Sequence, residues 1–572
     1  MQPIRKKFLE EKRMKKSISM ILAATAAISC LGFGAGCQAQ ENISKDEKTV
    51  NVKLYKAGFG DEFATVLEEK FNQAFAKEGY KMNIASSEYS NSGSTTLADL
   101  YDGFDKNGID LYITGAVMPN NVSETGIYER ELVEDLQSMV FDQPAINYDG
   151  SYSEKKISQR ISKDIMPYMK ADNGKTYGFT WAQTSAGMVV NTAKLAKYGI
   201  TELPRTTNEM FEVFDAIYNG ANGVPGTATS KTYAVTYCLK DAATYQNCAF
   251  DTWFAQFDID TYNEFLRMQT QNADGTWKDM QNGYEVFSNP NLTEAYAAAY
   301  EFMQPKYKAP GSESQPLDSI QSLVMQQAQG YNNAVFMLNG DWFLNEVKEN
   351  YSNLNDISFM NVPVISALGV KQFGASTKYA LDDAKCDEVL SLICKLVDEN
   401  KTIAEIKTSV AAAFDGLSLD DADIQAIATA RGICFSRGIE HLAYIAKGST
   451  KKEIAALVLR MMASDDFART FMETANGSSP YTQGVKVETP YNFVKNAQSV
   501  AANSYFRAIN SRIQGLRYEV LRTDIMMPPT TNDQLIRQLT TNTKDFKVAA
   551  QDLCTESYRE AKKEWEEYFS KK

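Results

Sequence analysis

The spacing of apolar residues between residues 49 and 86 restricts the possible folds of this chain more than any other feature. The stretch TVNVKLY (residues 49–55) alternates as a β-strand does, and residues 63–75 then repeat apolar side chains at helical spacing until Gly79. YKMNIAS alternates again. A strand, a loop, a helix and a second strand begin a parallel α/β sheet, and ligands gather at the carboxyl ends of such strands. Residues 55–61 are therefore the first candidate site loop.

The first residues have the layout of an export signal. Lys15 and Lys16 precede residues 17–33, an uncharged stretch of mostly apolar and small residues, and further small residues follow it. This stretch is shorter than the ~20 residues that a spanning helix needs, so a permanent transmembrane anchor is the less favoured alternative. The sequence predicts that residues 1–36 are a signal peptide.

The end of the signal carries a cysteine. The motif GAGC (residues 34–37) resembles the lipobox of bacterial lipoproteins, although Gly34 stands where Leu is usual. Cys30 is the rival position, but a polar tether is expected after a lipidated cysteine, and QAQENISKDEK follows Cys37. Two acyl chains anchor a protein stably. We therefore predict lipid on Cys37, a flexible tether over residues 37–48, and a location at the extracellular face of the cell membrane.

The mature chain is acidic and long. The full chain has 59 Lys and Arg and 72 Asp and Glu residues, and the signal peptide removes seven and two of these, which leaves a formal net charge of −18. Such a surface repels nucleic acid and anionic lipid headgroups. Of 572 residues, 536 remain after the signal, which exceeds the ~250 to 300 residues of one core. The sequence therefore predicts at least two lobes.

Three further segments have recognisable patterns. GIDLYITGAV is a near-continuous apolar run that is typical of a buried parallel strand. Residues 382–430 are typical of helices with a turn at Asp415 and Gly416, and we interpret them as an insertion. The tail from Val548 onward predicts an amphipathic helix.

The cysteines after Cys37 lie in a compartment that permits disulfides. Cys238 and Cys248 are the one close pair that is a candidate for a bond, and that question stays open. Cys386 and Cys394, if helical, lie ~12 Å apart along the axis, which is too far to bridge. No CxxC motif occurs, so we expect no metal, redox centre or cofactor.

Catalytic motifs are limited by a single histidine, His441, which we expect to be a surface or packed residue. A chain with one histidine cannot form an HExxH motif or a metal site with several histidines. The motifs GxSxG and GxxxxGK[ST] do not occur either. QNADGTWKDMQ is partly like a calcium loop, but Thr270 and Gln281 stand where carboxylates belong, so an Asp–Gly hairpin turn explains it better. Paired carboxylates are always available in an acidic chain, so glycoside hydrolysis stays an alternative.

Five stretches, in this order, resemble the extracellular solute-binding proteins of carbohydrate ABC importers. They are KAGFGDEFATVLEEKFNQAFAKEGYKMNI, GKTYGFTWAQTSAGMVVNTAKLAKYGI (174–200), NNAVFMLNGDWFLNEV (332–347), ISFMNVPVISALG (357–369) and KGSTKKEIAALVLRMMASDDFARTFMETANGSSPY (447–481). The resemblance covers nearly the whole mature chain apart from the helical insertion.

The resemblance implies an α/β fold of the two-lobed, periplasmic-binding-protein-like kind (type II), in which each lobe is a central sheet flanked by helices. A hinge joins the lobes and a ligand cleft lies between them. The implied crossings between lobes are near residues 181–187, 360–366 and 475–479. The implied lobes are residues 49–182 plus 363–475, which include the insertion, and residues 183–362 plus 476–572.

The residues themselves give a reason for a sugar ligand. A pyranose has an apolar C–H face and a ring of hydroxyls, so its site needs flat aromatic rings beside amides and carboxylates. TWAQTS places Trp181 and Gln183 on one side of an extended segment, and NGDW gathers polar groups and a ring at a turn. The predicted ligand-binding residues are Tyr55, Phe59, Asp61, Ser92, Trp181, Gln183, Trp253, Asn339, Asp341 and Trp342.

Several of these residues have a purely structural alternative. Trp181 and Trp342 also suit a hydrophobic core, and Trp253 suits the buried face of an amphipathic helix. Asp341 also suits the cap of a helix that begins at Trp342. Ser92 also suits an ordinary loop or a serine cap.

The sequence therefore predicts a monomeric, lipid-anchored binding component of an ABC importer, without catalytic activity, that captures a carbohydrate, in particular an oligosaccharide. Its expected partners are the carbohydrate ligand, a membrane permease and the membrane itself through the lipid anchor. Two alternatives stay open: an exported glycoside hydrolase or lyase, and the same fold with another solute such as a peptide or polyamine. Aromatic platforms favour a sugar, whereas a dense carboxylate cage favours a cation.

Overall fold

The computed structural model of the chain describes residues 43–55, 59–87, 104–114, 131–161, 165–169, 174–220, 232–236, 246–273, 276–309, 333–348, 354–435, 441–481, 485–503, 506–508 and 545–571. The chain divides into two units, residues 1–45 and 46–572, and the elements below belong to the second unit. The predicted lipid site Cys37 and the predicted ligand residue Ser92 lie outside the described residues.

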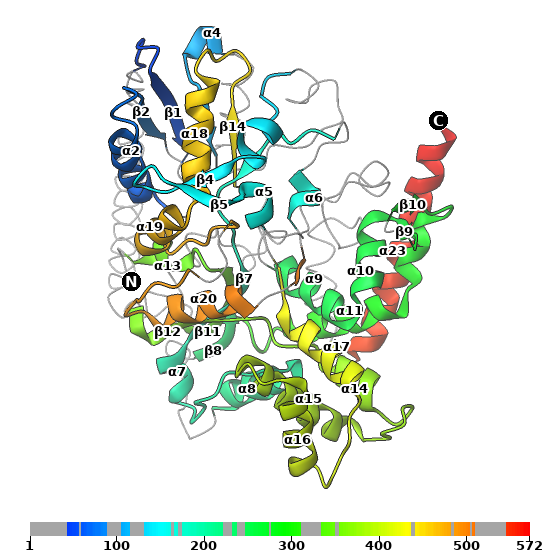
Figure 1. The fold of residues 1–572 in the computed structure, drawn as a ribbon. Coiled ribbons are helices and arrows are strands. Elements are labelled where there is room, and N and C mark those ends of the chain that lie inside the picture. Colours follow the sequence, from blue (N-terminus) through cyan, green and yellow to red (C-terminus); the bar gives the residue numbers. More distant parts are fainter. Residues whose placement is uncertain are drawn as a thin grey trace, which may run out of the picture. The chain divides into compact units, whose positions relative to one another are not determined.

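The first sheet has five strands in the order β2-β1-β3-β14-β6 (Figure 1). β1 is parallel to β2 and β3, and β14 is antiparallel to β3 and β6. The strands are β1 (Thr49–Tyr55), β2 (Lys81–Ser87), β3 (Leu111–Ile113), β6 (Phe179–Thr180) and β14 (Leu442–Ile445). The predicted parallel opening of the sheet is therefore confirmed.

Helix α2 (Glu62–Ala74) joins β1 to β2 and has the predicted apolar spacing. Phe63, Leu67 and Phe71 recur every four residues and are buried on one face. After the helix the chain turns at Gly79, whose φ of 74° lies in the left-handed region that glycine adopts readily. Helices α18 (Lys452–Met462) and α19 (Asp465–Ala475) complete the hydrophobic core of the first sheet.

An ion pair is buried in the first sheet. The carboxylate of Asp110 is fully buried, and its Oδ2 lies 3.0 Å from Lys451 Nζ. Lys451 Nζ also donates to Thr49 O at 2.8 Å. Ser449 Oγ donates to Asp110 Oδ1 at 2.6 Å, and Asn51 N donates to Asp110 Oδ2 at 2.8 Å. These bonds fasten β1 and the residue before β3 to the loop that leads into α18.

The second sheet has six strands: β15-β13-β7-β11-β8, with β12 also paired to β7. β7 is antiparallel to β11, β12 and β13, whereas β8 is parallel to β11 and β15 is parallel to β13. The strands are β7 (Ala186–Asn191), β8 (Thr232–Thr236), β11 (Asn333–Gly340), β12 (Ile357–Met360), β13 (Ile433–Phe435) and β15 (Phe506–Ala508).

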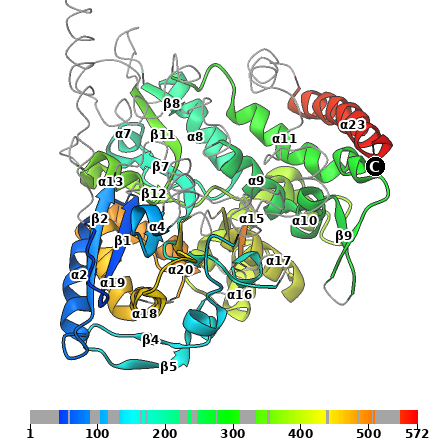
Figure 2. The same cartoon turned by 90° about the horizontal axis from the view of Figure 1, so that it is seen from above.

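Helices cover both faces of the second sheet (Figure 2). On one face, α13 (Phe343–Val347) and α20 (Asn492–Asn503) pack against Val189, Met337 and Phe359. The other face has the larger core. Its helices are α8 (Thr207–Asn219), α9 (Gln246–Phe257), α10 (Ile259–Arg267), α11 (Pro290–Phe302), α14 (Ala367–Phe373), α15 (Asp383–Asp398), α16 (Ile403–Ala413), α17 (Asp421–Gly432) and α23 (Phe546–Ser570).

The remaining elements are short. They are α4 (Phe104–Asn107), η1 (Gln137–Phe141), β4 (Pro144–Ile146), β5 (Tyr152–Lys156), α5 (Ile157–Arg160), α6 (Met166–Met169), α7 (Thr192–Ala196), β9 (Gln269–Gln271), β10 (Trp277–Asp279), η3 (Gly283–Ser288) and η5 (Leu354–Asp356). β9 and β10 pair as an antiparallel hairpin, as the interpretation of QNADGTWKDMQ expected, but the predicted two-residue Asp–Gly turn lies outside the described residues. Within the described ranges, no helix combines the length and apolar character that crossing a bilayer requires.

The predicted insertion is helical, and its helices pack in the core of the second sheet. α15, α16 and α17 cover residues 382–430, and Asp415 and Gly416 form the predicted turn with φ values of 48° and 82°. The resemblance placed this segment with the first lobe. The buried side chains Leu390 and Ile393 instead belong to the core of the second sheet, because α15 packs against α14 and α17 there.

The described cysteines Cys386, Cys394, Cys434 and Cys554 are unbridged and buried. The expectation that Cys386 and Cys394 do not bond is therefore confirmed. Burial raises the pKa of the Cys394 thiol to about 12, so this thiol stays protonated and unreactive at neutral pH. The possible bond between Cys238 and Cys248 stays a prediction, because Cys238 lies outside the described residues.

A cluster of ionisable groups joins α8 to the end of α11. Lys306 Nζ donates to Asp215 Oδ1 at 2.7 Å, and Tyr307 OH donates to the same oxygen at 2.8 Å. Glu301 lies near this pair and is partly buried. Burial raises the pKa of Glu301 to about 7; Lys306 opposes this rise and Asp215 adds to it.

We expect Glu301→Gln to stabilise the protein at pH 8 and to have little effect near pH 4. In the unfolded chain the carboxyl has a pKa of about 4.3, so between about pH 4 and 7 the folded protein keeps a proton that the unfolded chain loses. The stability of the wild type therefore falls as pH rises through this window. With allowance for solvent screening, the variant should gain about 2 kcal/mol at pH 8. Urea unfolding at both pH values tests this, and an equal difference at both would contradict the raised pKa.

Candidate functional site

The chain passes directly from the first sheet to the second between β6 and β7. Along this segment Trp181 N donates to His441 O at 3.0 Å, and Gln183 N donates to Ser478 O at 2.8 Å. His441 precedes β14 and Ser478 follows α19, so three distant parts of the sequence run side by side at this junction. The two segments predicted as passages, near residues 181–187 and 475–479, are paired here through Gln183 and Ser478, and the positions of the passages stay a prediction.

The remaining passage differs from the prediction. The sequence placed it at residues 360–366, but these lead from β12 into α14, and both elements pack on the second sheet. The physical reason is that Val362, Val364 and Ile365 are buried in the core of that sheet. The chain instead returns to the first sheet between β13 and β14, after the inserted helices.

The first predicted site loop lies beside Trp181. Tyr55 ends β1, and Phe59 and Asp61 precede α2. The side chains of Tyr55 and Phe59 are buried. The centroid of the Phe59 ring lies 6.1 Å from that of Trp181 and 5.4 Å from that of His441. His441 is thus a packed residue, one of the two roles expected for it.

Trp181 is enclosed by other rings. Its indole stacks on Phe63 at a centroid distance of 5.4 Å and an interplanar angle of 28°, and Phe471 lies 5.5 Å away. Its Nε1 donates to Thr114 O at 3.0 Å, and the exposed fraction of the side chain is 0%. In this arrangement the indole has no face open to a ligand, so its contacts are those of a core residue.

The end of β11 carries the second group of predicted residues. Asn339 pairs with Gly187 of β7. Asp341 N donates to Ser185 O at 3.0 Å, and Ser185 N donates back to Asp341 Oδ2 at 3.1 Å. Asp341 therefore fixes the start of β7. It does not cap α13, because Trp342 occupies the cap position and no side-chain cap bond forms.

Trp342 lies directly on the backbone of β11. A Cβ at Gly340 would approach Trp342 Cζ3 to 1.9 Å, so only glycine fits beneath the indole. Although β11 belongs to the second sheet, Trp342 packs in the core of the first, together with Trp181. Among the described residues it is the one member of that core from residues 183–435. The structure thus brings the two predicted indoles into one cluster across the junction.

Two polar atoms at this junction lack a hydrogen-bond partner in the described part of the chain. They are Asn339 Nδ2 and Ser185 Oγ, and both side chains are at least 98% buried. Buried polar atoms are normally hydrogen-bonded, so these two are candidates for bonds to a ligand. Ser185 was not predicted. The signal for it is the two-residue period of TWAQTS, which extends from Trp181 and Gln183 to Ser185.

Trp253 lies away from this junction. It is on α9, its Nε1 donates to Pro363 O at 3.1 Å, and its side chain is fully buried in the core of the second sheet. The surrounding segment forms α9 and α10, as the amphipathic-helix alternative predicted. The structure does not bring Trp253 together with Trp181 or Trp342.

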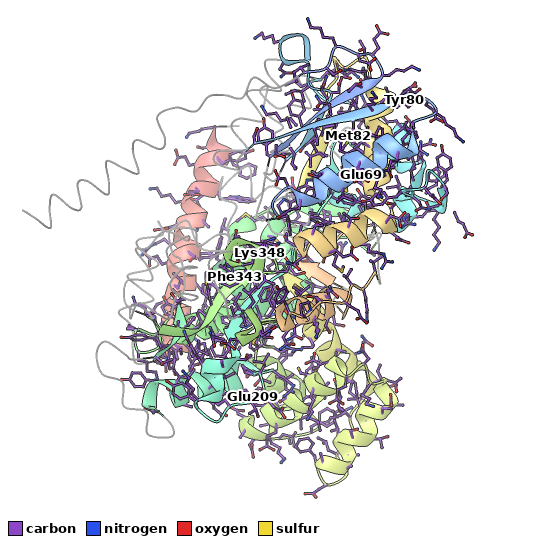
Figure 3. All side chains as sticks on the ribbon, turned by 90° about the vertical axis from the view of Figure 1, so that its left-hand side faces the viewer. Glu69, Tyr80, Met82, Glu209, Phe343 and Lys348 are labelled. Atoms are coloured by element: carbon purple, nitrogen blue, oxygen red, sulfur yellow. The ribbon has the colours of Figure 1, made fainter. Side chains whose placement is uncertain are left out.

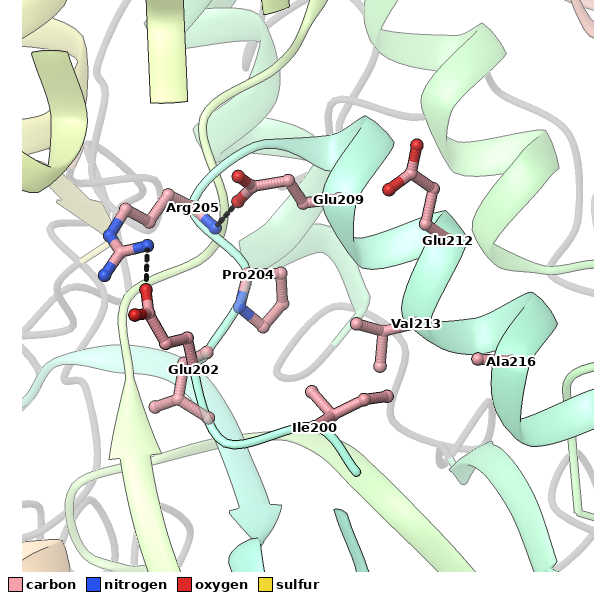
Figure 4. Close-up of a pocket in the computed structure, with 9 residues that line it drawn as sticks. Ile200, Glu202, Pro204, Arg205, Glu209, Glu212, Val213 and Ala216 are labelled. Carbon is pink, nitrogen blue, oxygen red and sulfur yellow. Dashed lines mark hydrogen bonds and ion pairs between the residues drawn. The ribbon is translucent and has the colours of Figure 1, made fainter. Parts of the chain in front are cut away.

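A separate groove of about 330 Å³ lies between α8 and the loop before it (Figure 4). Ile200 and Val213 line its apolar part. On its rim Arg205 Nη1 lies 3.1 Å from Glu202 Oε2, and Arg205 N donates to Glu209 Oε2 at 2.6 Å. The groove contains no aromatic ring, so it does not provide the stacking surface that a sugar needs.

No described group of three or more His, Cys, Asp and Glu side chains is arranged to hold a metal ion. At the junction an indole, a carboxylate, an amide and a hydroxyl lie next to one another, from Trp342, Asp341, Asn339 and Ser185. These groups can enclose an uncharged polar molecule and bond to its hydroxyls.

Comparisons with known proteins identify the fold. No protein-family model matches the chain, and no curated protein sequence resembles it significantly. Among solved structures, the bacterial solute receptor AcbH, described with an exclusive preference for β-D-galactopyranose, matches with a TM-score of 0.51 at 11% identity, over 90% of this chain and 99% of its own. RafE from Streptococcus pneumoniae matches with 0.51 at 12%, over 92% and 99%.

Maltose-bound MalE3 of T. maritima matches with a TM-score of 0.50 at 13% identity, over 89% of this chain and 98% of its own. The matches span nearly the full length of all three proteins. The chain therefore has the α/β, two-lobed, periplasmic-binding-protein-like fold that the sequence predicted.

Proposed function

We propose that this protein is a solute-binding receptor that captures a carbohydrate, in particular an oligosaccharide, and delivers it to the permease of an ABC importer. The fold supports this, because similar structures are a receptor for galactopyranose and a protein bound to maltose. The proposal rests mainly on the residues at the junction between the two sheets. There Trp342 lies beside Asn339, Asp341 and Ser185, where the chain passes between the two sheets.

The proposed contacts follow from the chemistry of a pyranose. Its apolar C–H face packs on the indole of Trp342, and its hydroxyls bond to polar groups. Asn339 Nδ2 and Ser185 Oγ are buried and have no hydrogen-bond partner among the described residues, so in this proposal they supply donors to sugar oxygens. The Asp341 carboxylate accepts from a hydroxyl.

The first lobe supplies the facing wall in this proposal. Its contacts are Tyr55, Phe59 and Asp61. Gln183, at the start of the second lobe, and Ser92, which lies outside the described residues, stay predicted contacts. Trp181 supports the position of Phe59, because the two rings pack edge to face. We propose that the first lobe consists of residues 46–182 and 441–481, and the second of residues 183–435 and 485–571.

The proposed location rests on the sequence. An export signal over residues 1–36 and lipid on Cys37 place the receptor at the outer face of the cell membrane, on a short polar tether. From there a loaded receptor reaches a permease in the same membrane.

We expect Trp342→Ala to weaken sugar binding by ~100-fold, because truncating a central aromatic contact removes roughly 2 to 3 kcal/mol of binding free energy. The sugar is first found by thermal shift with galactose, maltose, raffinose and chitin oligosaccharides. A tight ligand in excess stabilises the folded protein by ~3 to 4 kcal/mol. Titration calorimetry of wild type and variant then measures the loss.

The matched control is Trp277→Ala, which removes an indole from the β9–β10 hairpin, where it packs against Arg267. This control should bind the sugar as the wild type does. Mass spectrometry of the sugar after incubation separates a receptor from a hydrolase or lyase, because a receptor returns it unchanged. A wild type that binds no saccharide of the panel, or equal loss in both tryptophan variants, contradicts the proposal.

A further inference from the structure

One face of α13 points toward the opposite lobe. Trp342, Asn345 and Lys348 are spaced by three residues, and the two that flank the helix have right-handed helical backbone angles, so the three share one side of the helix. The other side carries Phe343, which packs with α20 on the second sheet. α13 is therefore anchored to the second lobe and presents three different side chains to the first.

Each of the three side chains contacts an element of the first lobe. Trp342 is in the core of the first sheet. Asn345 Nδ2 donates to Ala475 O at the end of α19, and Asn476 Nδ2 donates to Asn345 Oδ1 at 2.8 Å. Lys348 Nζ lies 3.8 Å from Glu62 Oε1 at the start of α2. Figure 3 labels Lys348 and Phe343 on α13, below the helix that carries Glu69.

The contact at Asn345 replaces an ordinary helix cap. Ala475 is the last residue of α19, and the final carbonyls of a helix have no partner within it. An amide from the other lobe supplies that partner here. Asn476 has a φ of 48°, a left-handed conformation that ends the helix and directs its side chain back to Asn345. The amide hydrogen bonds and the buried indole contribute more to the free energy of this contact than the ion pair of Lys348 does. A partly exposed ion pair stabilises little in water.

The contacts belong to an arrangement in which the proposed ligand residues are enclosed. Asn339 and Asp341 are each 2% exposed and Trp342 is 8% exposed. These side chains are almost completely shielded from solvent, and we infer from this that the arrangement is the closed one. Contacts made between lobes in this state stabilise it relative to any state in which the lobes separate.

We propose that Trp342, Asn345 and Lys348 form an interlobe clasp that stabilises the closed arrangement and so sets the rate of ligand release. Asn345 does this through Ala475 and Asn476 without touching the ligand. The proposal rests on the proposed function only for its ligand measurement, because the contacts of the clasp join residues of the chain to one another. β11 connects the clasp directly to Asn339 and Asp341, so closure at one brings the other into place.

The test uses the full chain with Asn345→Ala and, separately, Asn476→Gly. Glycine keeps the left-handed backbone at residue 476 while removing the side-chain amide, so the second variant loses the bond without new strain. Glu69→Ala on α2 is the control, since Glu69 is exposed and its recorded partners, Gln73 and Lys70, are on the same helix. Small-angle X-ray scattering without ligand should give a larger radius of gyration for both clasp variants and an unchanged value for the control.

The second measurement uses whichever of galactose, maltose, raffinose or chitin oligosaccharide the wild type binds. Both clasp variants should bind it about tenfold more weakly, through faster dissociation with an unchanged association rate. A merely structural role would lower the melting temperature without changing the scattering or the dissociation rate. Scattering profiles identical to the wild type, or unchanged dissociation rates, overturn the clasp. If no sugar binds the wild type, the proposed function fails while the scattering still decides the clasp.

Discussion

Replacing Lys451 with methionine is expected to lower the free energy of unfolding by about 3 to 5 kcal/mol. The reason is that Asp110 is fully buried and Lys451 Nζ, 3.0 Å away, is its counter-ion. Without the ammonium group the carboxylate stays in the interior with an uncompensated charge, and Thr49 O loses its donor. Urea unfolding followed by circular dichroism measures the loss.

The matched control is Lys447→Met. Lys447 Nζ lies 3.1 Å from Glu134 Oε2, and its side chain is 48% exposed, so this change should cost less than about 1 kcal/mol. Combining Asp110→Asn with Lys451→Met should recover part of the loss, because the unpaired charge is gone. Equal effects of the two lysine changes would contradict a special role for the buried pair.

Replacing Trp181 with alanine is expected to cost about 3 to 5 kcal/mol of stability, the cost of truncating a large buried ring. The indole is enclosed by Phe63, Phe471, Phe59 and His441, and its Nε1 bonds to Thr114 O. The alanine variant leaves a cavity among these rings and an unpaired carbonyl. Thermal and urea unfolding of the variant measure the effect.

Trp181→Phe separates the two contributions. Phenylalanine keeps most of the ring packing and loses the bond to Thr114 O, so it should cost about 1 to 2 kcal/mol. If Trp181→Ala were as stable as the wild type, the indole would not serve as a core residue and would be available for direct contact with a sugar.

The elements that could be predicted from sequence are those with a clear local period. β1, α2 and β2 follow from alternation and helical spacing within residues 49–86, and the helices of residues 382–430 follow from the same kind of pattern. Which lobe those helices join could not be predicted, because it depends on β13 pairing with β7 and β14 pairing with β3. Nothing in the local sequence specifies such distant partners.

The candidate site was predictable where polar and aromatic residues gather at a turn. Asn339, Asp341 and Trp342 meet at the end of β11, as NGDW suggested. The sequence could not decide whether Trp253 lies in the core or in a cleft. An aromatic residue on an amphipathic helix gives the same sequence pattern in both cases. The structure places it in the core, with its Nε1 bonded to Pro363 O.

The position of β14 in the chain determines when the first sheet can form during synthesis. Asp110 and Ser449, which bond within the first sheet, are 339 residues apart in the chain. The sheet gains its last strand, β14, only after most of the polypeptide has been synthesised, and contacts between such remote segments form slowly. Until the last quarter of the chain has been made, the first sheet therefore lacks the strand that joins β3 to β6, and any truncation before residue 442 removes that strand.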